Sequence, residues 1–327
     1  MKVRFVDYGK DYLRFKGEYD RAWHNTMRRG DLILRKDTEE FEQKLAEYVG
    51  TKYAIALSSG TDAIYLSLKA LGLGNKEFVS VPSHTFKSTC GAVIDADCKP
   101  YLYDLDEEPD VNWTHITAHI AGELYTIPEG RIVIEDACQA FGAIKNPTTS
   151  AQCWSFYPAK LLGGKGDNGA VTTNDPKVYE YIKEARNHFK SDHRDFGGNY
   201  RMDNLQAALL SVKLGHIDEI LGRRKEIAER YLKELNGVVG LPNNQKGRVW
   251  QDFIVRTQRR DELYNFLKEQ GAETMKNEYP FSVEYPKLPL AAKYEAETLR
   301  IPCNENLENV EVEYVIEKIK YFHANVW

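Results

Sequence analysis

The chain has 327 residues, of which 42% are hydrophobic and 28% charged, and its formal net charge is -5. This composition excludes a disordered chain, and the acidic balance excludes general binding to nucleic acid, so any phosphate must be held at a local site. The five cysteines lack metal-ligand spacing and no apolar run reaches membrane length, so we expect reduced thiols, no membrane contact and a cytoplasmic protein.

The length is enough to bury one large core and a smaller one. We therefore predict a large domain over residues 1–220 and a small α+β domain over residues 221–327. About the first 30 residues are expected to pack toward the small domain.

The first motifs describe a helix and then a strand that turns into a second helix. Asp37-Thr38-Glu39-Glu40 is a capping-box pattern, which predicts a helix start at Asp37. Residues 53–57 predict a strand, and Ser58-Ser59-Gly60-Thr61-Asp62 begins the next helix. Backbone amides at Ser59, Gly60 and Thr61 would suit a phosphate, although small residues at a helix start more often serve capping alone.

Strands predicted at residues 78–81, 101–105, 116–120 and 131–135 indicate a mostly parallel α/β sheet, in which ligands collect at the carboxyl ends of strands. Residues 121–130 are too few for the usual crossover helix, so we expect a trimmed connection there.

Three side chains follow the ends of these strands. Phe86 lies after the first of them, where core packing is the alternative role. Asp136 and Gln139 lie after the strand at 131–135, where an Asp more often forms a turn. Together Asp136 and Gln139 would suit a ligand that has both a basic nitrogen and an oxygen.

A lysine on a loop is the candidate for covalent chemistry. Residues 154–157 predict a strand that Pro158 stops, which leaves Lys160 where its amine could form a Schiff base, although most lysines are simply solvated. The loop at residues 187–199 contains His188, Asp192, His193 and Asp195, but no helix or strand sets their spacing, so no metal site is expected.

These groups match the parts of pyridoxal phosphate one by one. The amides of residues 59–61 and the Ser155 hydroxyl would bind the phosphate, Phe86 would stack on the ring, and Gln139 would bond the ring hydroxyl. Asp136 would keep the pyridine nitrogen protonated, and Lys160 would hold the cofactor.

Five motifs in this order resemble those of the DegT/StrS nucleotide-sugar aminotransferases: Ser59-Gly60-Thr61-Asp62-Ala63, Pro82-Ser83-His84-Thr85-Phe86, Glu135-Asp136-Ala137-Cys138-Gln139-Ala140, Ser155-Phe156-Tyr157-Pro158-Ala159-Lys160 and Asn199-Tyr200-Arg201-Met202-Asp203-Asn204-Leu205-Gln206-Ala207-Ala208. The resemblance covers residues 3–221, and more thinly the remainder. It implies the type I fold of pyridoxal-phosphate enzymes, a nucleotide-linked keto sugar as substrate and glutamate as amino donor. It also implies a homodimer with shared active sites, in which Asn199 reaches the cofactor phosphate of the neighbouring subunit.

Some positions depart from the family pattern, among them Phe141, the 121–130 connection and Glu278-Tyr279-Pro280, which lacks an expected histidine. The lysine motif followed by the residues Gly166 to Ala170 resembles family members that act on 3-keto sugars more than those that act at carbon 4, so the resemblance implies a 3-keto sugar. A related sugar dehydratase is disfavoured because Lys160 is present where those relatives have histidine. A non-catalytic regulator would be expected to lose Asp136, Gln139 or Lys160, and all three are present.

Overall fold

The computed structural model describes residues 1–108, 112–191, 193, 195–276 and 285–325. Its strands are β1 Tyr53–Leu57, β2 Phe78–Pro82, β3 Lys99–Tyr103, β4 Thr114–Ala118, β5 Val133–Asp136, β6 Ala151–Ser155, β7 Gly169–Thr173, β8 Phe253–Arg256, β9 Met275–Lys276 and β10 Thr298–Ile301. Its α-helices are α1 Tyr8–Arg14, α2 Lys16–Arg29, α3 Lys36–Val49, α4 Gly60–Ala70, α5 Lys87–Asp95, α6 Pro176–Ala185, α7 Asn204–Gly215, α8 Ile217–Glu234, α9 Arg260–Glu269, α10 Pro289–Glu297 and α11 Asn309–Asn325. Within the described part of the chain, no helix has both the length and the apolarity needed to cross a membrane.

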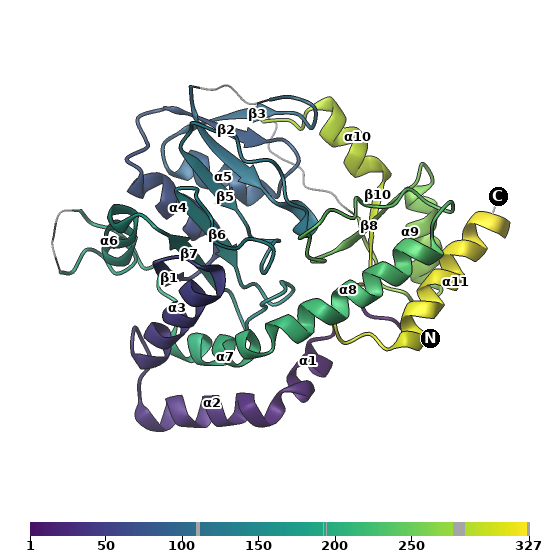
Figure 1. Ribbon diagram of the computed structural model, residues 1–327, viewed down its shortest axis with the longest axis horizontal. Coiled ribbons are helices and arrows are strands. Elements are labelled where there is room, and N and C mark those ends of the chain that lie inside the picture. Colours follow the sequence, from purple (N-terminus) through teal and green to yellow (C-terminus); the bar gives the residue numbers. More distant parts are fainter. Residues whose placement is uncertain (109–111, 192, 194, 277–284, 326–327) are drawn as a thin grey trace.

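The first seven strands form one sheet in the order β1-β7-β6-β5-β4-β2-β3, which is the predicted mostly parallel α/β sheet (Figure 1). Pairing is parallel from β6 through β5, β4 and β2 to β3, and antiparallel where β7 meets β6 and β1. The carboxyl ends of β1, β2, β4, β5 and β6 therefore share one edge, where the predicted site residues follow.

Helices cover the sheet on both faces. Alternate residues such as Val81, Ile116 and Cys153 are fully or almost fully buried in a core with α4, α5 and α6. On the other face, Trp154 and Phe156 pack with residues of α3 and α7. This two-sided burial explains why the strands read as apolar runs rather than as an alternating pattern.

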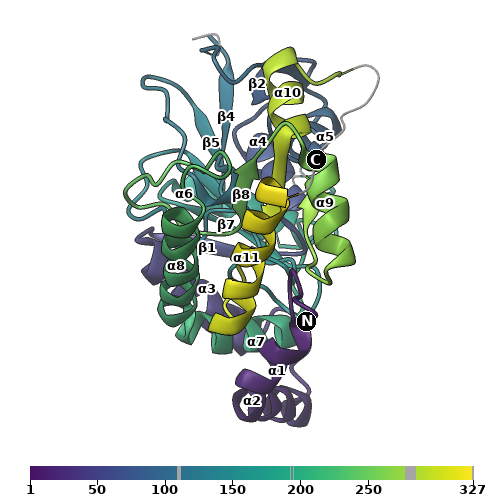
Figure 2. The same cartoon turned by 90° about the vertical axis from the view of Figure 1, so that its right-hand side faces the viewer.

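A second, three-stranded sheet has the order β8-β10-β9 and packs with α8, α9 and α11 around a core of its own. Helix α8 continues from the region of α7 under the large sheet toward this second sheet (Figure 1), and α11 lies beside it (Figure 2). The division at residue 220 remains a prediction, and it falls inside α8.

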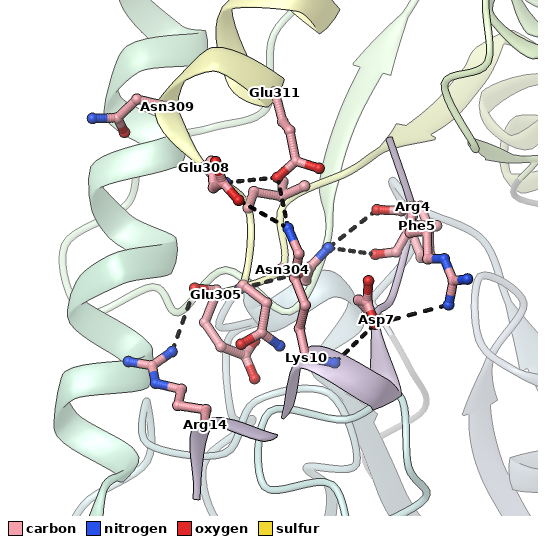
Figure 3. Close-up of polar contacts among 12 residues, drawn as sticks. Arg4, Phe5, Asp7, Lys10, Arg14, Asn304, Glu305, Glu308, Asn309 and Glu311 are labelled. Carbon is pink, nitrogen blue, oxygen red and sulfur yellow. Dashed lines mark hydrogen bonds and ion pairs between the residues drawn. The ribbon is translucent and has the colours of Figure 1, made fainter. Parts of the chain in front are cut away.

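The amino-terminal segment joins the second sheet's region. Val3 is buried in that core and forms a bridge with Ala272. Asn304 donates to the carbonyls of Arg4 and Phe5, and Lys10 on α1 pairs with Glu308 and Glu311 (Figure 3).

A charged cluster lies deeper in this region. Lys213 of α7 lies 3.0 Å from Asp11 of α1 and 3.4 Å from Glu305, which also takes a 2.7 Å bond from Arg224. All four side chains are almost fully buried. Because buried charges need partners, this cluster fixes α1 against α7, α8 and the segment before α11.

One helix start was predicted wrongly. Helix α3 begins at Lys36, one residue before Asp37, and its cap position is Arg35. Asn204 at the start of α7 accepts the Thr38 amide at 2.8 Å and donates to the Asp37 carboxylate at 2.7 Å. The Thr38 amide, in the first turn of α3, is thus bonded by a side chain from the start of another helix far along the chain.

The trimmed connection is confirmed: between β4 and β5 the structure has only a short 3₁₀ turn, Ile120–Gly122, and no α-helix. Gly122 approaches the Val249 backbone so closely that a Cβ would lie 2.1 Å from the Val249 carbonyl oxygen. Glu278-Tyr279-Pro280 and Asp192 lie outside the described residues.

Candidate active site

A cavity of about 510 Å³ lies at the carboxyl edge of the large sheet, with a wall from the second sheet. Eight of the nine residues predicted for the site line it: Ser59, Gly60, Thr61, Phe86, Asp136, Gln139, Ser155 and Lys160. The ninth, Asn199, does not. Asp252, Met275 and Arg300 line the cavity from the second sheet and the residue before it.

The turn after β1 lines the cavity with Ser59, Gly60 and Thr61, at the start of α4. Ser59 caps α4 by accepting the Asp62 amide at 3.0 Å, and the Asp62 carboxylate takes hydroxyl bonds from Ser58 and Ser59. Residue 60 must be glycine, since a Cβ there would lie 2.7 Å from the Cys138 sulfur and 2.9 Å from the Ser155 Cβ. The result is a helix start whose amides and positive dipole end suit an anion.

Asp136, at the end of β5, is held from two sides. Thr89 of α5 donates its hydroxyl to one carboxylate oxygen at 2.7 Å, and the Cys138 amide donates to the other at 3.2 Å. Burial raises the pKa of the Cys138 thiol well above its usual value, so this neighbour stays neutral. Asp136 is therefore a fixed, oriented carboxylate that can accept an N–H from a ligand.

Gln139 is oriented by the trimmed connection. Its Oε1 accepts the Ala121 amide at 2.8 Å. Because a backbone N–H can be satisfied only by the side-chain oxygen, Nε2 is the atom that can donate to a ligand oxygen. Ala121 adopts a φ of 56°, a left-handed conformation that a non-glycine residue rarely takes. The bond to Gln139 accompanies this strained position.

His119, beside Gln139, is a lining residue that was not predicted. Its Nδ1 accepts the Tyr125 amide at 3.1 Å, and its Nε2 lies 3.0 Å from the buried Glu135 carboxylate. Since Nδ1 is an acceptor, the proton of the neutral ring is on Nε2 and points to Glu135.

Lys160 lies on a tight loop after β6. Its amide donates to the Tyr157 carbonyl at 2.8 Å, and Gly164 donates to Phe156 at 2.8 Å. Gly163 passes so close to this loop that a Cβ would lie 2.2 Å from the Pro158 carbonyl oxygen. The glycines behind Lys160 are therefore needed to close the loop.

Gln251 fastens the same loop from the far side. Its Oε1 accepts the Leu161 amide at 2.9 Å, and its Nε2 donates to the Ala159 carbonyl at 3.0 Å. Both peptide groups that flank Lys160 are thus satisfied by one buried side chain just before β8.

Phe86 and Asn199 are both exposed, but of the two only Phe86 lines the cavity. Phe86, at the cap of α5, is 47% exposed and lines the cavity, so core packing is not its role. Asn199 forms a bridge with Asn187 outside the cavity, and nearby Phe196 is 92% exposed. Asn199 itself is exposed.

Sequence reasoning missed several residues that line the cavity or bond its lining residues: Phe5, Thr89, His119, Gln251, Asp252 and Arg300. His119 follows the end of β4 and carried the same strand-end signal as Phe86. Thr89 lies one helical turn after the predicted Phe86. The sequence around Gln251 and Arg300 gives no local indication of a functional site, because it has the pattern of ordinary strands.

The site fits pyridoxal phosphate. At the start of α4, position 60 leaves no room for a Cβ, so a phosphate could approach the backbone there. The fixed Asp136 carboxylate and the Gln139 amide donor line the cavity. Lys160 lines the same cavity. Fold and site together define a pyridoxal-phosphate enzyme of fold type I. The chain belongs to the DegT/DnrJ/EryC1/StrS aminotransferase family, whose model matches residues 15–127 and 124–320.

Two curated relatives and one solved structure place the chain within this family. The dTDP-3-amino-3,4,6-trideoxy-alpha-D-glucose transaminase of Streptomyces venezuelae is 33% identical over 99% of this chain and 97% of its own. The pleiotropic regulatory protein of Geobacillus stearothermophilus is also 33% identical, over 99% of this chain and 100% of its own. The crystal structure of S. venezuelae DesV in complex with a ketimine intermediate superposes with a TM-score of 0.93 at 31% identity, covering both chains fully.

Proposed function

We propose that this chain transfers an amino group from glutamate to the keto carbon of a nucleotide-linked sugar, at carbon 3. The observation that carries the proposal is that Lys160 and the fixed Asp136 carboxylate line one cavity with an anion-binding helix start. The relative from S. venezuelae, named for a 3-amino sugar, supports the choice of substrate.

When bound, pyridoxal phosphate supplies an electron sink for the charge left when a proton leaves the carbon that bears the nitrogen. The amides of residues 59–61 and the Ser155 hydroxyl would bind its phosphate, and Phe86 would cover its ring. The Gln139 amide would donate to the ring oxygen. Asp136, fixed by Thr89 and Cys138, would accept the pyridine N–H and so keep that nitrogen protonated.

Lys160 would have two roles in turn. Its amine would hold the cofactor, and as a free base within the cavity it would take up and return the proton that leaves the donor carbon. The loop held by Gln251 keeps the amine within the cavity during both roles. The same proton shuttle runs in the opposite direction when the sugar ketone is aminated.

We also propose that the enzyme is a homodimer with shared sites. Asn199 is exposed and outside its own cavity, and Phe196 beside it would be covered by a partner. The partner subunit's Asn199 would then complete the phosphate site, and a two-fold interface would complete both sites together.

The first experiment separates catalysis from regulation, since one relative is named as a regulatory protein. Protein incubated with pyridoxal phosphate should be yellow, and borohydride should remove the absorbance band and add the mass of the cofactor at Lys160. Colourless protein with unmodified Lys160 would instead favour the regulator.

The second experiment assigns the position of the amine. Turnover should be measured with pairs of 3-keto and 4-keto nucleotide sugars and glutamate. We expect turnover of a 3-keto sugar, and activity confined to 4-keto isomers would refute the assignment.

A further inference from the structure

A second cavity of about 510 Å³ lies beside β4 of the large sheet. Its lining comes from the end of β4, from the segment Asp104 to Glu108 after β3, and from residues between Tyr125 and Arg131 in the trimmed connection. Within the described residues, none lines both this second cavity and the catalytic one. A crossover helix usually covers a parallel sheet at such a connection, so the trimmed connection leaves this space open.

Two polar atoms of β4 in this second cavity have no hydrogen-bond partner. His115 and Thr117 alternate along the strand, so both side chains lie on the same face of the sheet. Each is only 2% exposed and each lines the cavity, yet within the described residues nothing bonds Nδ1 of His115 or Oγ1 of Thr117. Because unbonded polar atoms destabilise a buried site, these two indicate a partner inside the cavity.

The other contacts of His115 show which kind of partner Nδ1 needs. Its Nε2 lies 3.3 Å from the Tyr103 hydroxyl, and that hydroxyl lies 3.4 Å from the Ile116 carbonyl. A hydroxyl has one hydrogen and a carbonyl only accepts, so both bonds form together only when Nε2 carries the ring proton. Burial, and to a smaller degree Arg131, lower the pKa of His115 to about 4, which keeps the ring neutral at pH 7. Nδ1 is therefore an acceptor that needs a donor.

The charges of the lining favour a donor that is a cation. Within the described residues, one arginine, Arg131, lines the second cavity together with five carboxylates: Asp104, Asp106, Glu107, Glu108 and Glu129. Asp104 accepts the amides of Leu290 and Ala291, and Glu107 accepts the Asp104 amide, so these two carboxylates serve the fold. The other three are exposed and therefore lie at the mouth of the cavity, where they attract positive charge.

We propose that this second cavity binds an alkyl diamine, with one ammonium group bonded to His115 Nδ1 and the Thr117 hydroxyl and the other among the carboxylates at the mouth. An ammonium group donates up to three charge-assisted N–H bonds. The rings of Tyr103 and Tyr125, which also line the cavity, offer faces to a cation and to the alkyl chain. No three His, Cys, Asp or Glu of the described residues are placed to hold a metal ion, so an organic cation fits better. The site does not depend on the reaction in the catalytic cavity.

The main test is calorimetric binding of 1,4-diaminobutane. The protein is first loaded with pyridoxal phosphate and reduced with borohydride, so that the amine cannot react in the catalytic cavity. Thr117→Val keeps the side-chain shape and removes the hydroxyl. Thr114→Val is the matched control, since Thr114 is buried on the same strand and does not line the second cavity. We expect Thr117→Val to raise the dissociation constant roughly 10-fold and Thr114→Val to match the parent.

Two results of this test would overturn the inference. If ordered water is the only partner of His115 and Thr117, the parent will not bind the diamine. Equal affinity in the parent and Thr117→Val would place the diamine elsewhere.

A second measurement needs no ligand. Valine at position 117 gives up no hydrogen bond, so Thr117→Val without diamine should be at least as stable as the parent in denaturant unfolding. A clear loss of stability would show that the hydroxyl bonds the fold itself, and the inference would fail.

Two further probes separate the ends of the ligand. The hexamethylated diamine keeps both charges and has no N–H, so it should bind roughly 10-fold more weakly. Equal binding would mean that His115 accepts no N–H from the ligand. The double variant Glu108→Gln with Glu129→Gln, at two exposed positions, should weaken binding of 1,4-diaminobutane and leave that of 1-aminobutane unchanged. Unchanged affinity for the diamine would refute the site proposed for its second ammonium group.

Discussion

The side chain of Gln251 bonds the backbone on both sides of Lys160, at Ala159 and at Leu161. Gln251 comes from the segment that leads into the second sheet, so the Lys160 loop of the large sheet is fastened by a residue ninety positions away. The position of the Lys160 amine thus depends on how the two sheets are joined.

Gln251→Leu should lower turnover by roughly 10-fold or more, because two buried peptide groups lose their partner and the loop relaxes. Gln245→Leu is the matched control, since Gln245 makes the same pair of bonds to the backbone of Leu124, at 3.0 and 2.9 Å, outside the cavity. Both variants should lose stability of about 1–3 kcal/mol in denaturant unfolding. Loss of turnover in both, or in neither, would contradict a specific role for Gln251.

Lys160→Ala should abolish transamination and leave the fold intact, because a partly exposed loop lysine contributes little packing energy. Thermal unfolding should change little. After borohydride treatment with cofactor, mass spectrometry should find the added mass on Lys160 in the parent and no addition in the variant. Residual turnover near the parent rate would mean that another amine does the chemistry.

Asp136→Asn should remove most turnover while much of the cofactor stays bound, because an amide cannot keep the pyridine nitrogen protonated. Thr89→Val keeps the shape of the side chain and removes only the hydroxyl that donates to Asp136, so a smaller loss, roughly 10-fold, is expected. The cofactor absorbance gives occupancy, and single-turnover kinetics give the chemical step. Parent-like kinetics in Asp136→Asn would show that the ring lies elsewhere.

Shared sites can be tested by mixing two inactive variants, Lys160→Ala and Asn199→Asp, the second of which places a carboxylate against the phosphate. A mixed dimer contains one site in which Lys160 and the partner subunit's Asn199 are both native, so activity should return as subunits exchange. If Asn199 serves its own subunit, every site keeps one defect and the mixture stays inactive.

Acid stability should depend on Glu305. Burial alone would raise the pKa of this carboxyl, but Arg224 and Lys213 outweigh burial and lower the pKa to about 2 from an ordinary value of 4.5. A lowered pKa stabilises the fold above pH 4.5, and the stabilisation is lost as the pH falls from there toward 2. The full effect is on the order of 3 kcal/mol. Unfolding free energies of the parent and Glu305→Gln between pH 7 and pH 2 should converge at low pH, and parallel curves would contradict the assignment.

Much of the site could be predicted because its residues follow strand ends within short motifs. Gly60, Asp136 and Lys160 each lie within a few residues of a strand, so local pattern and family resemblance were enough to bring them together. Thr89, Gln251 and Arg300 act through hydrogen bonds or cavity walls that only the packed fold creates.

The start of α3 was misjudged for the same reason. The local pattern assigns the Asp37 carboxylate to a helix cap, but that carboxylate accepts a hydrogen bond from Asn204, a residue of another helix. Asn199 is a different case, because its predicted partner is on another copy of the chain.

The order of the strands has a consequence for how the protein is made. Strand β1 leaves the ribosome first, yet it pairs with β7, the last strand of the sheet to be synthesised. Until residues 169–173 emerge, β1 and the turn that follows it have no neighbouring strand on this side of the sheet. Nascent chains that stall before β7 would therefore expose an unpaired strand edge and depend on chaperones. Chains that stall just after β7 could already pair β1 and complete the turn at Gly60.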